Sequence, residues 1–323
     1  MSSASGVDSD PASSPIPFPP LKDDEVLLRL DIPSNCGAGL NGPYLGELSN
    51  PPSHNTIGYG SAGTVLEAGP KCFLQRDDKV AINLLTPCRR CHACCRDKEY
   101  SKCISKSLHT QYTPGMFISL PRALVALLPP PLTLEEGSLI QVLALAVKMV
   151  NKADPKPGQG VIVLGVSCLG IIFCLLARAR GVRQIMVVDR DDGRLNVARK
   201  FVRFLETQSA DTVAVMTCVV PEGTDAANGA AAVVQAFGRE ADVCVNATGE
   251  YGLMNVASKT VKSGGVYVHA GVRESEVSWD VLGMWREDIT IHGEVCCEDL
   301  NYEEAVKMVM LGEVSLREFC PQE

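Results

Sequence analysis

Hydrophobic and polar residues alternate in two different ways along this chain. In the first part, short strand-like runs such as EVLLRL (25–30) and KVAINL (79–84) are interrupted by Gly and Pro, which predicts a β-rich domain. After Pro157, short apolar runs alternate with helical ones, which predicts a parallel sheet with helices on both faces. Between these regions, residues 134–150 are apolar nearly all round and predict a buried helix.

The second region contains the more regular elements. Strands are expected at 161–166, 185–189, 212–220, 243–247, 266–271 and 288–292. Helices are expected at 171–180, 194–205, 228–238, 253–261 and 301–312. Residues 1–20 are rich in Ser, Pro, Gly and Asp, which is typical of a disordered or extended arm.

Composition and charge limit the classes of function. A length of 323 residues suggests about two domains, and 46% hydrophobic residues suit a folded protein. With 30 basic and 38 acidic residues the net charge is −8, which disfavours binding to nucleic acid or to an anionic membrane. The chain has neither a long apolar run nor a secretory signal pattern, so we expect a cytoplasmic protein.

A glycine-rich turn follows the first strand of the second region. Gly165, Ser167 and Gly170 occupy the positions of a G-x-G-x-x-G turn, which places a pyrophosphate at a helix N-terminus. Ser167 replaces the middle glycine, and its side chain is expected to weaken binding or to shift its geometry. Asp189 ends the next strand, where a carboxylate accepts hydrogen bonds from the adenosine ribose and repels a 2′-phosphate. The cofactor expected is therefore NAD(H). The neighbouring Arg190 reduces this preference, since a guanidinium could accept the phosphate of NADP(H).

A dense cluster of cysteines predicts a structural zinc site. Four thiolates can bind one tetrahedral zinc, and this leaves no open position for substrate. The spacing admits either of two adjacent cysteines as the third ligand, so the choice between Cys94 and Cys95 is open. The five candidates are Cys88, Cys91, Cys94, Cys95 and Cys103.

Together these features resemble the medium-chain dehydrogenase/reductase superfamily, and within it the zinc-containing alcohol and polyol dehydrogenases. The resemblance extends from about residue 24 to residue 314. It is carried by EVLLRL, the segment around Cys36, GYGSAGTVLEAG (58–69), the cysteine lobe, GVSCLG (165–170), Asp189, NATG (246–249) and SGGVYVHAGV (263–272).

The resemblance implies an α/β architecture of two domains. One is a β-rich, chaperonin-10-like (GroES-like) catalytic domain at 21–143 with the zinc lobe at 88–103. The other is a Rossmann domain, a doubly wound parallel sheet, at 144–293. Residues 294–323 would be a shortened return to the catalytic domain. The same resemblance assigns Gly165, Gly170 and Asp189 to the cofactor, and places Thr248 and Gly271 in the nicotinamide pocket.

The catalytic-metal site departs from the family pattern. Cys36 matches the first zinc ligand, but Tyr59 stands in place of the ligand histidine and Gly60 in place of the following glutamate. Gln141 replaces a further glutamate of the polyol branch. Zinc catalysis needs three firm ligands and an open position, so we expect no catalytic zinc and a buried thiol at Cys36. Tyr59 is either a proton donor to substrate or an aromatic side chain that fills the vacated space.

Three functions are compatible with these residues. The preferred one is a zinc-free, nicotinamide-dependent oxidoreductase of a small carbonyl, alcohol or activated double bond, with a step in specialised-metabolite biosynthesis as one role. The second is a zinc-dependent alcohol or polyol dehydrogenase in which His54 is an atypical ligand. The third is a catalytically silent NAD(H)-binding paralogue. A homo-oligomer is also expected, because members of the family are often dimers or tetramers.

Overall fold

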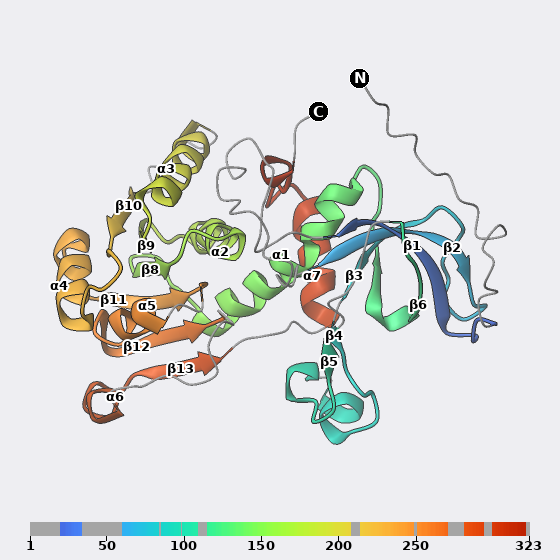
Figure 1. Ribbon diagram of the computed structural model, residues 1–323, viewed down its shortest axis with the longest axis horizontal. Coiled ribbons are helices and arrows are strands. Elements are labelled where there is room, and N and C mark those ends of the chain that lie inside the picture. Colours follow the sequence, from blue (N-terminus) through green and yellow to red (C-terminus); the bar gives the residue numbers. More distant parts are fainter. Residues whose placement is uncertain are drawn as a thin grey trace.

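The computed structural model describes residues 20–33, 60–83, 85–97, 99–108, 115–207, 214–248, 251–270, 281–293 and 299–320. An antiparallel sheet and a parallel sheet lie at opposite ends of the molecule, and helix α1 lies between them (Figure 1). The α/β architecture expected from the sequence is confirmed. Cys36, Tyr59, His54, Gly271 and the expected N-terminal arm up to residue 19 fall outside the described residues.

The first sheet is antiparallel and five-stranded. Its strand order is β6 (Phe117–Pro121), β1 (Glu25–Pro33), β2 (Ser61–Ala68), β3 (Lys79–Ile82) and β7 (Val125–Leu127). Alternate apolar residues of β1, namely Val26, Leu28 and Leu30, are fully buried in its core. This period of two explains why the run was recognisable as a strand.

The second sheet is parallel and six-stranded. Its strand order is β10 (Ala214–Val219), β9 (Gln184–Asp189), β8 (Gly160–Leu164), β11 (Ala241–Asn246), β12 (Val261–His269) and β13 (Thr290–Gly293). The direction in which strands are added reverses between β8 and β11. In open α/β sheets of this kind, ligands bind at this reversal, outside the carboxyl ends of the strands.

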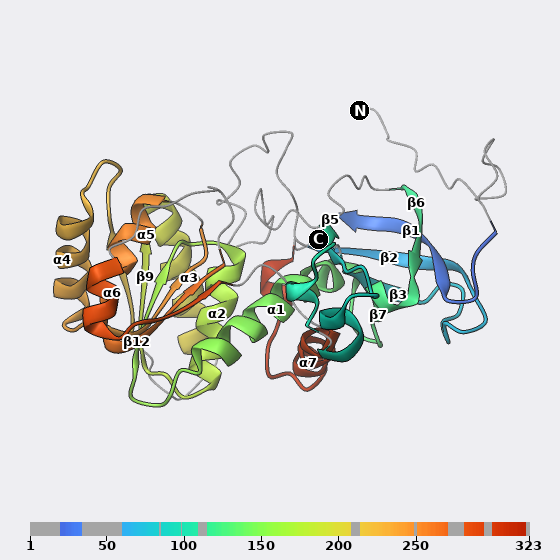
Figure 2. The same ribbon diagram turned by 90° about the horizontal axis from the view of Figure 1, so that it is seen from below.

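Helices cover both faces of the parallel sheet (Figure 2). Alternate strand residues face α2 (Cys168–Ala179) and α3 (Asp192–Thr207) on one side, together with α1. The residues between them face α4 (Ala226–Phe237) and α5 (Tyr251–Ala257) on the other side. Because both faces are covered, strands such as β8 are apolar along their whole length.

Helix α1 (Leu134–Ala153) packs against both parts of the molecule. It begins at a capping box, in which the Thr133 hydroxyl accepts from the Glu136 N–H and the Glu136 carboxylate accepts from the Thr133 N–H. It contacts β1, β2 and β3 on one side, α2 and β12 on the other, and α7 (Asp299–Met310). This double contact explains why its sequence is apolar nearly all round. In the described part of the chain, no helix is long and apolar enough to cross a membrane.

The C-terminal segment, which comprises α7 and the residues after it, contacts both the β-rich part and the parallel-sheet part. A cavity of about 420 Å³ lies between α7 and residues 122–127 of the β-rich part. Further on, Phe319 in a short 3-10 turn (Arg317–Phe319) packs against Phe201 of α3, with 5.2 Å between the ring centroids. The C-terminal segment thus contacts the Rossmann side as well as the β-rich side.

Two element predictions need correction. The helix expected over 253–261 ends at Ala257, and Val261 already belongs to β12. Val261 pairs with Ala241, and the register shifts before the next pair, Val266 with Val243. Gly264, between them, has a positive φ of 70°. The first part of β12 is therefore an irregular strand with a bulge-like shift in pairing. Helix α6 (Val281–Glu287) was not predicted at all.

Candidate functional site

The turn after β8 depends on its two outer glycines. Gly165 has φ of 101°, and a Cβ atom there would lie 1.7 Å from Cγ2 of Thr248, which comes from the end of β11. A Cβ atom on Gly170 would lie 2.5 Å from the carbonyl oxygen of Gly165. Glycine at both positions therefore allows the turn, helix α2 and the neighbouring strand to approach closely.

Ser167 caps helix α2. Its Oγ accepts a hydrogen bond from the Gly170 N–H at 3.1 Å and donates one to the carbonyl oxygen of Ala247 at 3.2 Å. The first N–H groups of any α-helix have no carbonyl acceptor within the helix itself. These are the groups that a pyrophosphate can accept from. The hydroxymethyl group, expected to weaken binding, thus also orders the helix end.

Asp189 links the glycine turn to the end of β9. Its side chain is only 4% exposed, its Oδ2 accepts from the Val166 N–H at 2.8 Å, and its Oδ1 accepts from the Asp191 N–H at 3.1 Å. Each carboxylate oxygen can accept a further bond. The carboxylate thus ties the glycine turn to the end of β9. Arg190, the next residue, donates from Nη1 to the carbonyl oxygen of Pro221 at 3.1 Å.

A buried polar group supports Thr248. Both the N–H and the hydroxyl of Thr248 donate to Oδ1 of Asn246 at 3.0 Å, and Asn246 has no exposed surface. On β12, the Tyr267 hydroxyl lies 3.1 Å from Nδ1 of His269. Burial raises the pKa of Tyr267 well above its usual value, so this phenol stays protonated. In the sequence, Asn246 was noted only as part of NATG. A polar residue at the end of an apolar strand was a signal that could have marked it as a functional residue.

The expected catalytic-metal region is only partly within the described residues. A Cβ atom on Gly60 would lie 2.4 Å from the carbonyl oxygen of Ser138 and 3.2 Å from Cβ of Gln141. Gly60 and Gln141 are therefore neighbours in space, and Gln141 is 6% exposed. These are the two positions at which the resemblance called for glutamates. Neither residue offers a carboxylate, so this part of the donor set does not fit a catalytic zinc.

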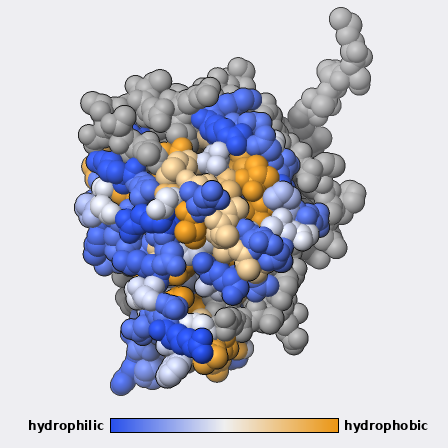
Figure 3. All heavy atoms as spheres, turned by 90° about the vertical axis from the view of Figure 1, so that its left-hand side faces the viewer, coloured by the Kyte–Doolittle hydropathy of each residue, from blue (hydrophilic) through white to orange (hydrophobic). Residues whose placement is uncertain are grey.

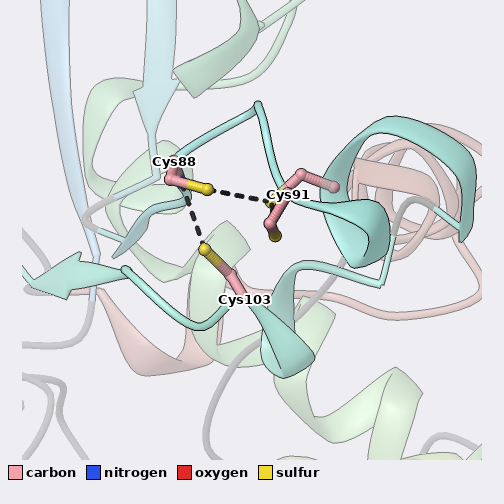
Figure 4. Close-up of side chains that lie close together, drawn as sticks. Cys88, Cys91 and Cys103 are labelled. Atoms are coloured by element: carbon pink, nitrogen blue, oxygen red, sulfur yellow. Dashed lines mark hydrogen bonds between the residues drawn. The ribbon is translucent and has the colours of Figure 1, made fainter.

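Four cysteines meet in a small lobe next to β4 (Leu85–Thr86) and β5 (Ser107–Leu108). The Sγ atoms of Cys88, Cys91, Cys94 and Cys103 all lie within 4.8 Å of one another. Figure 4 shows the sulfurs of Cys88, Cys91 and Cys103 turned towards one another. In a tetrahedral zinc–thiolate site with bonds of about 2.3 Å, sulfurs are about 3.8 Å apart. These residues therefore fit a structural zinc.

The structure separates the two adjacent cysteines. Residues Ala93–Asp97 form one π-helical turn, and such turns accommodate one extra residue in a helix. Within it, Cys94 is buried in the cluster, with its Sγ 3.4 Å from that of Cys91. Cys95 is exposed, and its thiol donates to the carbonyl oxygen of Arg89 at 3.2 Å. Cys94 is thus brought to the other thiols and Cys95 is not.

The surroundings of the thiols favour partial ionisation. Backbone N–H groups of Arg90 and Cys91 lower the pKa of Cys88 to about 6, and the N–H of Cys94 lowers that of Cys91. Burial, together with the neighbouring thiols, raises the pKa of Cys94 to about 12. Four thiolates cannot be held this close without a compensating cation, which a divalent metal supplies.

Comparison with known proteins identifies the family. Residues 22–130 match the alcohol dehydrogenase GroES-like domain, and residues 168–310 match the zinc-binding dehydrogenase family. The D-xylulose reductase A of Aspergillus niger is 28% identical over 269 residues, which cover 81% of this chain and 72% of that protein. That of Aspergillus oryzae is 26% identical and covers 94% and 84%.

Solved structures share the same fold. The alcohol dehydrogenase TADH of Thermus sp. ATN1 superposes with a TM-score of 0.73 at 18% identity, covering 94% of this chain and 88% of that one. Galactitol-1-phosphate dehydrogenase of Escherichia coli gives 0.71 at 19% identity, covering 94% and 86%. The chain therefore belongs to the medium-chain dehydrogenase/reductase superfamily, in the zinc-containing alcohol and polyol dehydrogenase-like group. By family it is a nicotinamide-dependent oxidoreductase.

Proposed function

We propose that this protein uses NAD(H) to reduce or oxidise a small organic substrate without a catalytic zinc. The observation that carries the proposal is the reversal of the parallel sheet, where the turn containing Gly165 contacts both Asp189 and Thr248. Its relatives are named as reductases or dehydrogenases of sugars and alcohols, which supports a carbonyl or alcohol substrate. An activated double bond is the further substrate class that a site without a Lewis acid could reduce.

The chain's own residues would bind and orient the cofactor, which supplies the hydride. The capped start of α2 offers N–H groups to the pyrophosphate, and Asp189 accepts from the adenosine ribose. The acidic group at this position favours NAD(H) over NADP(H). Thr248, held by Asn246, and Gly271 would line the nicotinamide end.

The absence of two carboxylates near α1 supports chemistry without a catalytic zinc. Gly60 and Gln141 are neighbours, so a metal there would lack both of the carboxylates that the resemblance calls for. Tyr59, the residue before Gly60, would then be the proton donor to the substrate oxygen, and Cys36 a thiol rather than a ligand. A role in specialised metabolism is part of the same proposal.

Two measurements test this function. Metal analysis of the purified protein is expected to find one zinc per chain, held by Cys88, Cys91, Cys94 and Cys103. NADH oxidation against a panel of ketones and enones is expected to show turnover, which Tyr59→Phe reduces. Two zincs per chain would support the zinc-dependent alternative, and NADH binding without turnover on any substrate would support a silent paralogue.

We also propose that the chain divides into a catalytic domain at 21–143 with 294–323 and a Rossmann domain at 144–293. Helix α1, which contacts both sheets, would contain the first boundary. Because packing rather than a linker joins the two parts, the boundary is expected to resist cleavage by proteases. Limited proteolysis followed by mass spectrometry checks this, and ready cleavage within α1 would contradict it.

We also propose that the protein forms a homo-oligomer through the edge of the parallel sheet. Strand β13 lies at the edge of the parallel sheet, and next to it Val281, Leu282 and Trp285 of α6 are 71%, 55% and 78% exposed. Figure 3 shows apolar surface on this side of the molecule, over α4 and, lower down, over α6. An open strand edge beside exposed apolar side chains is typical of a surface that another chain covers.

A further inference from the structure

Arg190 lies beside the adenosine end of the proposed cofactor site and contacts two other segments. Its Nη1 donates to the carbonyl oxygen of Pro221, just after β10. Its Nη2 lies 1.7 Å from the position that a Cβ atom on Gly252, in α5, would occupy. Gly252 therefore leaves open the space that this end of the guanidinium fills.

The distances around Gly252 define the direction of the guanidinium. The same Cβ position lies 3.0 Å from Cζ and 3.7 Å from Nη1 of Arg190. Because a C–N bond of this kind is about 1.3 Å long, the Cβ position, Nη2 and Cζ lie almost on one line. The guanidinium thus meets Gly252 end-on. With Nη1 hydrogen-bonded and Nη2 against Gly252, the guanidinium plane has few orientations left.

The charges around Arg190 disfavour a 2′-phosphate. Asp189 and Asp191 flank it in sequence; the Asp189 carboxylate accepts from the Val166 N–H and the Asp191 carboxylate from the Gly193 N–H. Asp192 follows and forms an ion pair with Arg199 at 2.9 Å. Two carboxylates therefore oppose one guanidinium at the position where a 2′-phosphate would bind. Stacking on a neutral ring, by contrast, needs no net positive charge in the surroundings.

We propose that Gly252 is a positioning residue for Arg190, which it holds so that the guanidinium plane stacks on the adenine ring of NAD(H). This inference rests on the proposed function, since it requires that the glycine turn and Asp189 bind a dinucleotide. The ribose at Asp189 places the adenine next to residue 190. Guanidinium planes stack well on aromatic and nucleobase faces, whereas an ammonium has no plane to offer.

The test measures dissociation constants by nucleotide fluorescence for NADH, for NADPH and for reduced nicotinamide mononucleotide, which lacks the adenosine. Gly252→Ala and Arg190→Ala are expected to weaken NADH binding about tenfold and to leave mononucleotide binding unchanged. Arg190→Lys is expected to weaken NADH binding as well. The matched control is Asn255→Ala, one turn further along α5, which is expected to bind NADH as the unaltered protein does.

Four results would overturn the inference. If Arg190→Ala weakens NADPH binding more than NADH binding, the guanidinium recognises the 2′-phosphate and not the adenine. If Arg190→Ala weakens NADH binding but Gly252→Ala does not, Gly252 is not a positioning residue. An equal loss of mononucleotide binding would show a general disturbance of the site. If the unaltered protein binds none of the three nucleotides, the proposed function itself fails, which is a distinct result.

Discussion

Replacing Gly165 with alanine tests the geometry of the glycine turn. The new methyl group would lie 1.7 Å from Cγ2 of Thr248, and the backbone would keep φ of 101°. A non-glycine residue in this conformation costs about 1–3 kcal/mol. Overpacking against the Thr248 methyl group costs about 1–3 kcal/mol more. We therefore expect Gly165→Ala to lower the free energy of unfolding by about 2–6 kcal/mol.

A second substitution separates the two causes. Thr248→Ser removes Cγ2 but keeps the hydroxyl that donates to Asn246. Alone, it is expected to lower the free energy of unfolding by about 0.5–1.5 kcal/mol. In the double variant most of the steric part disappears, although Cβ of residue 248 still lies 3.1 Å from the new methyl group. The backbone part remains, so the two effects should be coupled by about 1–3 kcal/mol. Urea unfolding followed by circular dichroism measures all four proteins. Additive effects would show that Gly165 and Thr248 do not meet as described.

Three further predictions concern other parts of the molecule. Cys94→Ser is expected to lose most of the bound zinc and Cys95→Ser to retain it, as measured by metal analysis; equal retention would contradict the assignment of Cys94. The buried carboxylate of Asp242 receives hydrogen bonds from Lys262 and the Gly160 N–H. Burial opposes its ionisation, but these partners prevail and lower its pKa. Its stabilising effect is therefore complete above the unfolded-state pKa and is lost as the pH falls through the lower folded-state value. Asp242→Asn should thus lower stability by about 1–3 kcal/mol at pH 7 and much less in strong acid; the same deficit in denaturant titrations at both pH values would refute this. Trp285→Lys is expected to shift the protein towards monomer in light scattering, whereas an unchanged mass would exclude α6 from the interface.

Local sequence patterns were enough to predict most elements of the parallel sheet. VIVLGV and IMVVD correspond to β8 and β9, and the helical runs after them correspond to α2 and α3. These patterns are reliable because strands buried on both faces are continuously apolar and short. The pattern failed at the start of β12, where the run is broken by two adjacent glycines. It also failed at α6, whose apolar residues are exposed and thus do not mark a buried face.

The candidate cofactor site was predicted from motifs, but its internal contacts were not. The glycine positions and Asp189 follow from their order along the chain. That Ser167 caps α2 while bonding to Ala247 depends on β11 lying beside β8, which is a contact between residues 80 positions apart. Likewise, Gly252 and Arg190 meet only because α5 packs near the end of β9.

The sequence by itself determined the two-part architecture, the glycine turn with its acidic partner and the presence of a thiol cluster. Each of these features follows from residues that are close together in the sequence or that recur at a regular spacing. Only the tertiary structure decided that Cys94 rather than Cys95 joins the other thiols, because a single π-helical turn rotates one side chain inwards and the next outwards. It also decided that Gly60 and Gln141 are neighbours. Such contacts join residues far apart in sequence, and local periodicity carries no information about which distant segments will pack together.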